Sequence, residues 1–139
     1  MRPTAVTDAL KSILVMDLSS LDELLVALTT VVQSAAPRVV VIDSLAALVN
    51  SRLDATMATL SRLQTLAHCM RRLAADHNLT VVLVNHQVGS AEGVPKAAMG
   101  TLWQSVPNVR IFLDRRLSTW TATILKSPSF KTQTVCVEF

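Results

Sequence analysis

The stretch Arg38-Val39-Val40-Val41-Ile42-Asp43-Ser44 decides the fold of this chain. In it, consecutive branched apolar residues end abruptly in a carboxylate. A continuous apolar run, unlike an alternating one, is typical of a strand that is buried on both faces, as in a parallel sheet covered by helices. Asp43 then lies at the carboxyl end of the strand, which is where such sheets bind their ligands.

Two interpretations of Asp43 fit this position. The pattern is typical of a Walker B segment, in which the aspartate holds the Mg²⁺ of a bound nucleotide, often through water. The alternative is a buried strand whose terminal aspartate caps the turn or helix that follows. The stretch alone favours neither, so the choice depends on the rest of the chain.

Composition bounds the class of protein. The chain has 139 residues, of which 50% are hydrophobic and 17% are charged, so we expect one folded domain over residues 1–139, with residues 1–11 as a tail. No apolar stretch approaches the ~18 residues of a membrane span, and the N-terminus lacks the apolar segment of a signal peptide. A net charge of +3 permits a nucleic-acid or nucleotide partner without requiring one.

Hydrophobic patterning predicts an alternation of strands and helices, followed by short strands. Ser20-Leu21-Asp22-Glu23 is a capping box that begins a helix, and Pro37 closes that region. The expected strands are Ile13–Met16, Val39–Ile42, Val81–Val84, Val109–Leu113, Trp120–Leu125 and Thr134–Phe139; a long helix covers about 55–76, and Val88–Ala98 is a loop. The fold class is therefore α/β, a parallel sheet flanked by helices with an antiparallel C-terminal extension.

Segments in a particular order carry a resemblance to a known family. They are Arg38–Ser44, then Val82-Leu83-Val84-Asn85-His86, then Ala98-Met99-Gly100-Thr101-Leu102-Trp103 with Arg110, then Leu125-Lys126-Ser127-Pro128. From about Ile13 onward the chain resembles the C-terminal half of the RecA-type ATPase core, as found in eukaryotic Rad-family recombinases and especially in their paralogues. The resemblance implies a partial RecA-like P-loop NTPase fold and a role in DNA repair by homologous recombination, in the nucleus if the chain is eukaryotic and otherwise inside the cell.

The resemblance also implies roles for individual residues. Asp43 would belong to the Mg²⁺–ATP site, and Asn85 would sense the γ-phosphate. His86 stands where the recombinases usually have glutamine. Lys126 and Pro128 match the segment that caps ATP bound by an adjacent protomer, where a lysine would neutralise charge on the phosphate oxygens. The alternative for Lys126 is an exposed lysine at a strand end.

Two loops correspond to the DNA-facing loops of the family. In residues 50 to 55 the basic candidate for contact with single-stranded DNA is Arg52, and in residues 86 to 98 it is Lys96. The second loop also carries Glu92 and has little positive charge. A solvated loop lysine is therefore the alternative for Lys96.

A phosphate-binding loop is missing from the sequence. The pattern Gly-x-x-x-x-Gly-Lys-Ser/Thr does not occur, and the glycines are Gly89, Gly93 and Gly100. Without that loop there is no cradle of backbone N–H groups for the β- and γ-phosphates. In the family, this loop and the catalytic glutamate lie upstream of the motifs found here. We therefore expect a fragment or a degenerate member, without independent ATP hydrolysis, that binds ATP and Mg²⁺ only with a partner or an upstream segment.

Three hypotheses follow from the sequence. The first is a recombinase paralogue, or a piece of one, that assembles with other RecA-fold paralogues on single-stranded DNA. The second is a non-catalytic protein-interaction module that keeps a degenerate RecA-like fold. The third is an unrelated α/β domain whose strand resembles a Walker B segment by chance. The spacing of the later motifs argues against this third hypothesis.

The missing strand leads to a structural prediction. In RecA-type sheets the strand of the phosphate-binding loop lies beside the one that here carries Val81 to Val84. Without it we expect an unpaired edge at Val81–Val84, or a later strand moved in to close the gap. An unpaired edge invites pairing with another chain. The isolated chain should therefore be aggregation-prone, oligomeric or dependent on a partner.

Overall fold

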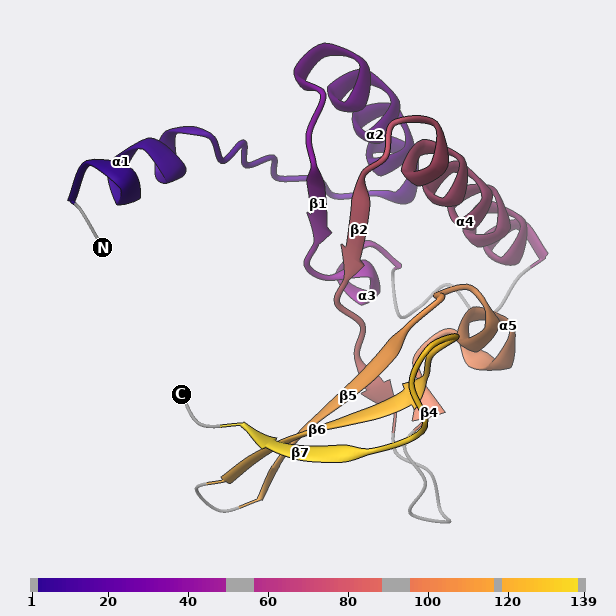
Figure 1. Cartoon of the computed structure of the whole chain (residues 1–139). Coiled ribbons are helices and arrows are strands. Elements are labelled where there is room, and N and C mark those ends of the chain that lie inside the picture. The colour runs from indigo at the N-terminus through magenta and orange to yellow at the C-terminus, as the bar shows by residue number, and fades with distance from the viewer. Residues whose placement is uncertain (1–2, 50–56, 89–95, 117–118, 138–139) are drawn as a thin grey trace. The chain divides into compact units, whose positions relative to one another are not determined.

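A computed structural model describes residues 3–49, 57–88, 96–116 and 119–137. This part of the chain falls into two compact units, Met1–Val84 and Asn85–Phe139. The first holds α1 (Pro3–Lys11), α2 (Leu21–Ala35), β1 (Val39–Ile42), α3 (Leu45–Leu48), α4 (Met57–Asp76) and β2 (Thr80–Leu83); the second holds β3 (Gln87–Val88), β4 (Lys96–Ala97), α5 (Gly100–Ser105), β5 (Arg110–Arg116), β6 (Thr119–Lys126) and β7 (Thr134–Val137) (Figure 1). The expectation of one domain over residues 1–139 stays a prediction.

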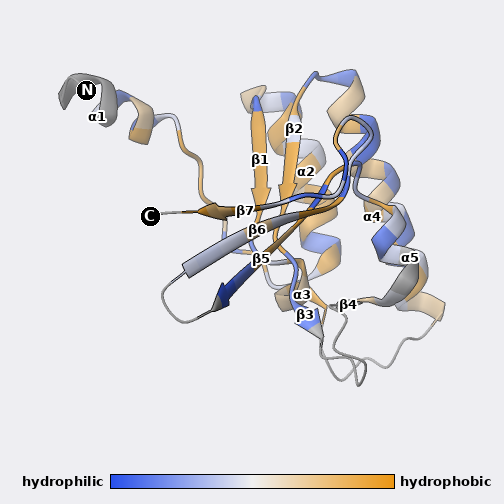
Figure 2. Cartoon of the chain, turned by 60° about the horizontal axis from the view of Figure 1, so that its bottom comes forward, coloured by the Kyte–Doolittle hydropathy of each residue, from blue (hydrophilic) through white to orange (hydrophobic). Residues whose placement is uncertain are grey.

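The decisive stretch forms a strand as predicted. Within the described residues, β1 pairs in parallel with β2 alone, with Val40 opposite Val81 and Ile42 opposite Leu83. Both strands are apolar throughout, except at Thr80 (Figure 2). Since β2 has no second partner in the described part of the chain, the predicted unpaired edge at this strand is confirmed there.

The expectation that β1 and β2 are buried on both faces is wrong. Val40, Ile42, Val81 and Leu83 share a face and are buried or half-buried, whereas Val39 and Val41 on the opposite face are 55% and 61% exposed. In the first unit, α2 and α4 pack against each other beside the strands (Figure 1). No described helix of this unit shields the other face. We call its residues the bare valine face, defined as Val39, Val41, Val82 and Val84.

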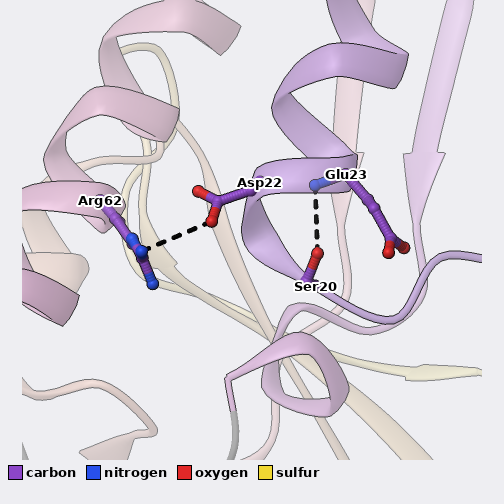
Figure 3. A network of polar contacts seen from close by, with 4 residues as sticks. All are labelled: Ser20, Asp22, Glu23 and Arg62. Carbon is purple, nitrogen blue, oxygen red and sulfur yellow. Dashed lines mark hydrogen bonds and ion pairs between the residues drawn. The ribbon is translucent and has the colours of Figure 1, made fainter.

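The predicted capping box begins α2. The Ser20 hydroxyl accepts the backbone N–H of Glu23 at 3.2 Å, and the Glu23 carboxylate accepts the N–H of Ser19 at 2.8 Å (Figure 3 shows the first). The backbone and hydroxyl of Ser19 donate to this carboxylate and hold the pKa of Glu23 below its ordinary value. The helix ends where Ala36 takes a left-handed conformation ahead of Pro37, which cannot continue a helix.

The core of the first unit lies between α2 and α4. Its buried apolar side chains recur at helical spacing on each helix, and they are Leu21, Leu24, Leu28 and Val32 on α2, and Leu63, Leu66, Ala67 and Met70 on α4. Burying one such leucine contributes about 1.5–3 kcal/mol. An ion pair between Arg62 and Asp22 (3.5 Å; Figure 3) joins the two helices, but both side chains are exposed and its contribution is small.

One expectation for the N-terminal residues is wrong, and another stays a prediction. The tail over residues 1–11 stays a prediction, and within it Pro3–Lys11 is a helix that starts with proline at its first position. Ile13–Met16 is not a buried strand: no strand of the described residues pairs with it, and Val15 is 87% exposed. An apolar segment becomes a strand only when a neighbour accepts its backbone hydrogen bonds.

The second unit contains the predicted hairpin. Within the described residues, β5, β6 and β7 form an antiparallel sheet in that order. One face is apolar, with Ile111, Leu113, Ala122, Ile124 and Val135, and the other carries threonines, of which Thr123 and Thr134 join their hydroxyls at 2.8 Å. The α/β class with parallel and antiparallel pairing is thus confirmed, although the two pairings belong to separate sheets.

Other features of the second unit refine the expectations. The ends of the predicted Val88–Ala98 loop form a short ladder, β3 with β4. Trp103 on α5 is 2% exposed and is a packing residue. At the β5–β6 hairpin the Arg115 guanidinium lies 5.5 Å from the ring centre of Trp120. None of the helices in the described part of the chain is both long and apolar enough to cross a bilayer.

Candidate functional site

Asp43 lies immediately after β1, at its carboxyl end, in the first unit. Around it, the backbone is fixed by two bonds to the end of β2: Val84 donates to the Ile42 carbonyl at 2.9 Å, and Leu45 donates to the Val84 carbonyl at 3.1 Å. The Asp43 side chain is exposed and makes no hydrogen bond or ion pair with the described residues. The capping alternative therefore has no hydrogen bond to support it there.

The possible metal ligands around Asp43 fit a site in which substrate and water complete the coordination of the ion. No group of three His, Cys, Asp or Glu side chains that could enclose a metal ion occurs in the described ranges. A cage made of protein ligands alone is thus absent from them. A single exposed carboxylate at a strand end is nevertheless what Mg²⁺ uses when substrate phosphates and water supply its remaining ligands. Asp43 fits that second arrangement.

A hollow of about 880 Å³ lies along β1 in the first unit. It is bounded by the extended segment from Ser12 to Leu18, by one side of α2 and by the strand from Arg38 to Ser44. Most of these residues are apolar, and Asp17, Arg38 and Asp43 are the charged ones.

Unlike Asp43, Asn85 already uses its side chain in hydrogen bonds within the chain. It belongs to the second unit and is half-buried. Its side-chain N–H₂ group donates to the Ala98 carbonyl at 3.2 Å, while its Oδ1 accepts the backbone N–H of His86 at 2.9 Å. The Ala98 N–H in turn donates to the His86 carbonyl at 2.9 Å. Asn85 thus ties together the two ends of the β3–β4 segment, and a phosphate contact would use the same amide.

Lys126 is the last residue of β6, and its ammonium group is already engaged. Nζ donates to the Ser105 carbonyl at 2.8 Å, at the C-terminal end of α5. A cation at this end of a helix is favoured by the helix dipole. Pro128 is exposed two residues later, in the connection to β7.

Of the two DNA-binding candidates, one lies within the described residues and the other does not. Lys96 lies in β4, where its backbone is opposite Val88. Arg52 falls outside the described residues.

The predicted site residues are divided between the two units. Asp43 belongs to the first unit, and Asn85, Lys96, Lys126 and Pro128 belong to the second. Within the second unit, the hydrogen bonds of Asn85 and Lys126 are features that sequence reasoning missed, because neither Ala98 nor Ser105 carries a side-chain signal.

Comparison with known proteins shows a similarity to a DNA repair protein. The chain is 34% identical over 103 residues to the DNA repair protein RAD51 homolog 4 of Bos taurus, and the aligned region covers 68% of this chain and 32% of the relative. The chain therefore spans about a third of the length of that relative. No known protein-family model matches the chain. The similarity supports kinship with the RAD51-type recombinase paralogues.

Proposed function

We propose that this chain is a recombinase-paralogue segment that acts in DNA repair by homologous recombination, in the nucleus, by assembling with other RecA-fold paralogues. The similarity to RAD51 homolog 4 carries this proposal. The parallel β1–β2 pair that ends in the unengaged Asp43 carboxylate supports it. The bare valine face supports the need for a partner, because burying exposed valines against another surface is favourable.

The ATP site in this proposal is shared. Asp43 would hold Mg²⁺, which when bound neutralises charge on the phosphate oxygens. Lys126 and Pro128 would face nucleotide held by an adjacent protomer. For that role the Lys126 ammonium must leave the Ser105 carbonyl, and the attraction of a triphosphate for a cation is sufficient to favour the exchange. The isolated chain should neither hydrolyse ATP nor bind it tightly, because one carboxylate does not replace a phosphate cradle.

Association with a purified RecA-fold paralogue, followed by analytical ultracentrifugation with and without ATP and Mg²⁺, tests the proposal. We expect ATP to tighten association, and we expect Asp43→Asn and Lys126→Ala each to remove roughly tenfold, about 1.4 kcal/mol, of that effect. The matched controls are Asp8→Asn and Lys131→Ala, which alter exposed side chains of the same types. Absence of any association would refute the assembly role.

DNA binding is a separate part of the proposal. If Arg52 and Lys96 contact phosphates, affinity for single-stranded DNA should fall steeply with salt and depend little on sequence. Replacing either residue by alanine should then reduce the slope of log affinity against log salt by about one. Fluorescence anisotropy with a labelled oligonucleotide measures this slope, with Lys11→Ala as the control. Unchanged slopes in both variants would remove DNA from the proposed function.

A second candidate function is a non-catalytic interaction module with a degenerate RecA-like fold. The hydrogen bonds that already occupy the Asn85 amide and the Lys126 ammonium favour it, because each satisfies the group within the chain. In the same association experiment, this module would bind its partner equally well without ATP. Asp43→Asn and Lys126→Ala would then bind like the unmodified chain.

A further inference from the structure

The connection between β6 and β7 carries a serine in an unusual setting. This loop runs from Ser127 to Gln133 and is closed at its base by the Ile124 N–H, which donates to the Gln133 carbonyl at 2.9 Å. Every residue of the loop after Ser127 is exposed, Phe130 to 64%. Ser127 precedes Pro128, and the sequence contains no other serine or threonine followed by proline.

The Ser127 hydroxyl oxygen lies in a small cradle of backbone donors. Its Oγ accepts the N–H of Ser129 at 3.2 Å and the N–H of Phe130 at 3.1 Å. The hydroxyl proton has no acceptor among the described residues. The oxygen is therefore held in place by two donors while its own proton stays available for transfer.

We propose that Ser127 is a phosphorylation site for a proline-directed serine/threonine kinase. In this reaction the Ser127 Oγ forms a bond to the γ-phosphorus of the kinase's ATP, and the bond from that phosphorus to the β–γ bridging oxygen breaks. ADP leaves, and the hydroxyl proton passes to the kinase's catalytic base. Pro128 suits such a kinase because it lacks a backbone N–H and biases Ser127 towards extended backbone.

The loop is also built to hold the product. A seryl phosphate carries about −1.5 to −2 charges at neutral pH and has three acceptor oxygens. The N–H groups of Ser129 and Phe130 already converge on the Ser127 oxygen, so phosphate oxygens on that atom lie within their reach. Lys131 in the same loop is exposed and supplies positive charge, whereas the Lys126 ammonium donates to the Ser105 carbonyl. Donors and cations that favour the dianion lower the second pKa of the phosphate.

The first experiment asks whether the site is used. The full chain is incubated with a purified mitogen-activated protein kinase and ATP, and the product is mapped by mass spectrometry with fragmentation. We expect one phosphoryl group, on Ser127, at least tenfold less of it in Pro128→Ala, and normal incorporation in the control Ser129→Ala. Incorporation elsewhere, no incorporation, or no effect of Pro128→Ala would overturn the proposal.

The second experiment asks whether the loop holds the phosphate. Phosphorus NMR titration compares the phosphorylated chain with a phosphorylated synthetic peptide of residues 122–134. We expect the second pKa of the phosphate to be lower in the chain by roughly half a pH unit, and Lys131→Met to recover part of the difference. Equal pKa values in chain and peptide would disprove the preformed cradle. The proposal concerns a modification, so neither experiment depends on ATP binding or partner assembly by this chain.

Discussion

The β1–β2 pair and the β5–β6–β7 sheet differ in how apolar side chains are distributed between their two faces. In the antiparallel sheet, apolar and threonine residues alternate along β6, so one face carries Ala122 and Ile124 and the other carries Thr121 and Thr123. The apolar face is not covered within the described residues, since Ile111 and Leu113 are 60% and 59% exposed. In the parallel pair both faces are apolar, and the described helices α2 and α4 cover one of them. The residues of a strand therefore determine how much apolar surface must be buried. The side chains that bury this surface must come from other segments or from other chains.

The largest effect should come from the covered side of the first unit. Leu66 is fully buried between α2 and α4, so Leu66→Ala should cost about 2–5 kcal/mol in the free energy of unfolding. Urea unfolding followed by circular dichroism measures the loss. The control Val26→Ala changes a side chain of α2 that is 66% exposed and should cost little. Equal losses in the two variants would mean that the core lies elsewhere.

The bare valine face should control self-association. We expect the isolated chain to be oligomeric or aggregation-prone, and the triple variant Val39→Thr, Val41→Thr, Val82→Thr to weaken association. At about 1 kcal/mol for each exposed valine made polar, the dissociation constant should rise roughly a hundredfold. Sedimentation velocity over a range of concentrations measures it. A monomeric parent chain with a concentration-independent unfolding transition would show that this face needs no partner.

A smaller effect tests the second unit. Lys126→Ala removes the bond from Nζ to the Ser105 carbonyl at the end of α5, which should cost about 0.5–1 kcal/mol. Thermal unfolding followed by tryptophan fluorescence measures it, because Trp103 lies on the same helix. Lys131→Ala is the control. A loss no larger than that of the control would mean that the bond contributes nothing to stability.

The smallest effect concerns the capping box of α2. Donation from Ser19 lowers the pKa of Glu23 in the folded chain, so the contribution of this carboxylate is present above its unfolded pKa and lost as the pH falls through its folded pKa. The melting temperatures of the parent chain and Glu23→Ala should therefore differ at pH 7 and converge under acid. The control Asp8→Asn should not show this pattern. A difference that persists at pH 2 would assign the effect to helix propensity instead.

Much of the fold could be predicted from local signals. The β1 strand, the capping box at Ser20 and the β5–β6 hairpin each depend on residues that are close in sequence. Ile13–Met16 has the composition of a strand, but pairing depends on a neighbour that composition does not specify. The α1 helix is short, and its clearest signal is proline at the first position, which also fits a tail.

The candidate site could be predicted less well than the fold. The place of Asp43 at the end of β1 could be predicted because strand and carboxylate are adjacent in the sequence, whereas its role in binding Mg²⁺ stays a prediction. The contacts of Asn85 with Ala98 and of Lys126 with Ser105 join polar side chains to backbone carbonyls across 13 and 21 residues. Every residue except proline offers the same carbonyl and N–H groups, so sequence carries no mark of which one a side chain will meet.

The distribution of chromophores has a practical consequence. Both tryptophans, Trp103 and Trp120, belong to the second unit, and the chain contains no tyrosine. The longer helices, α2 and α4, belong to the first. Fluorescence emission therefore reports on the second unit, and ellipticity at helical wavelengths reports mainly on the first. A single sample heated once, with both signals recorded, follows each half of the molecule through its own melting curve without any label or substitution.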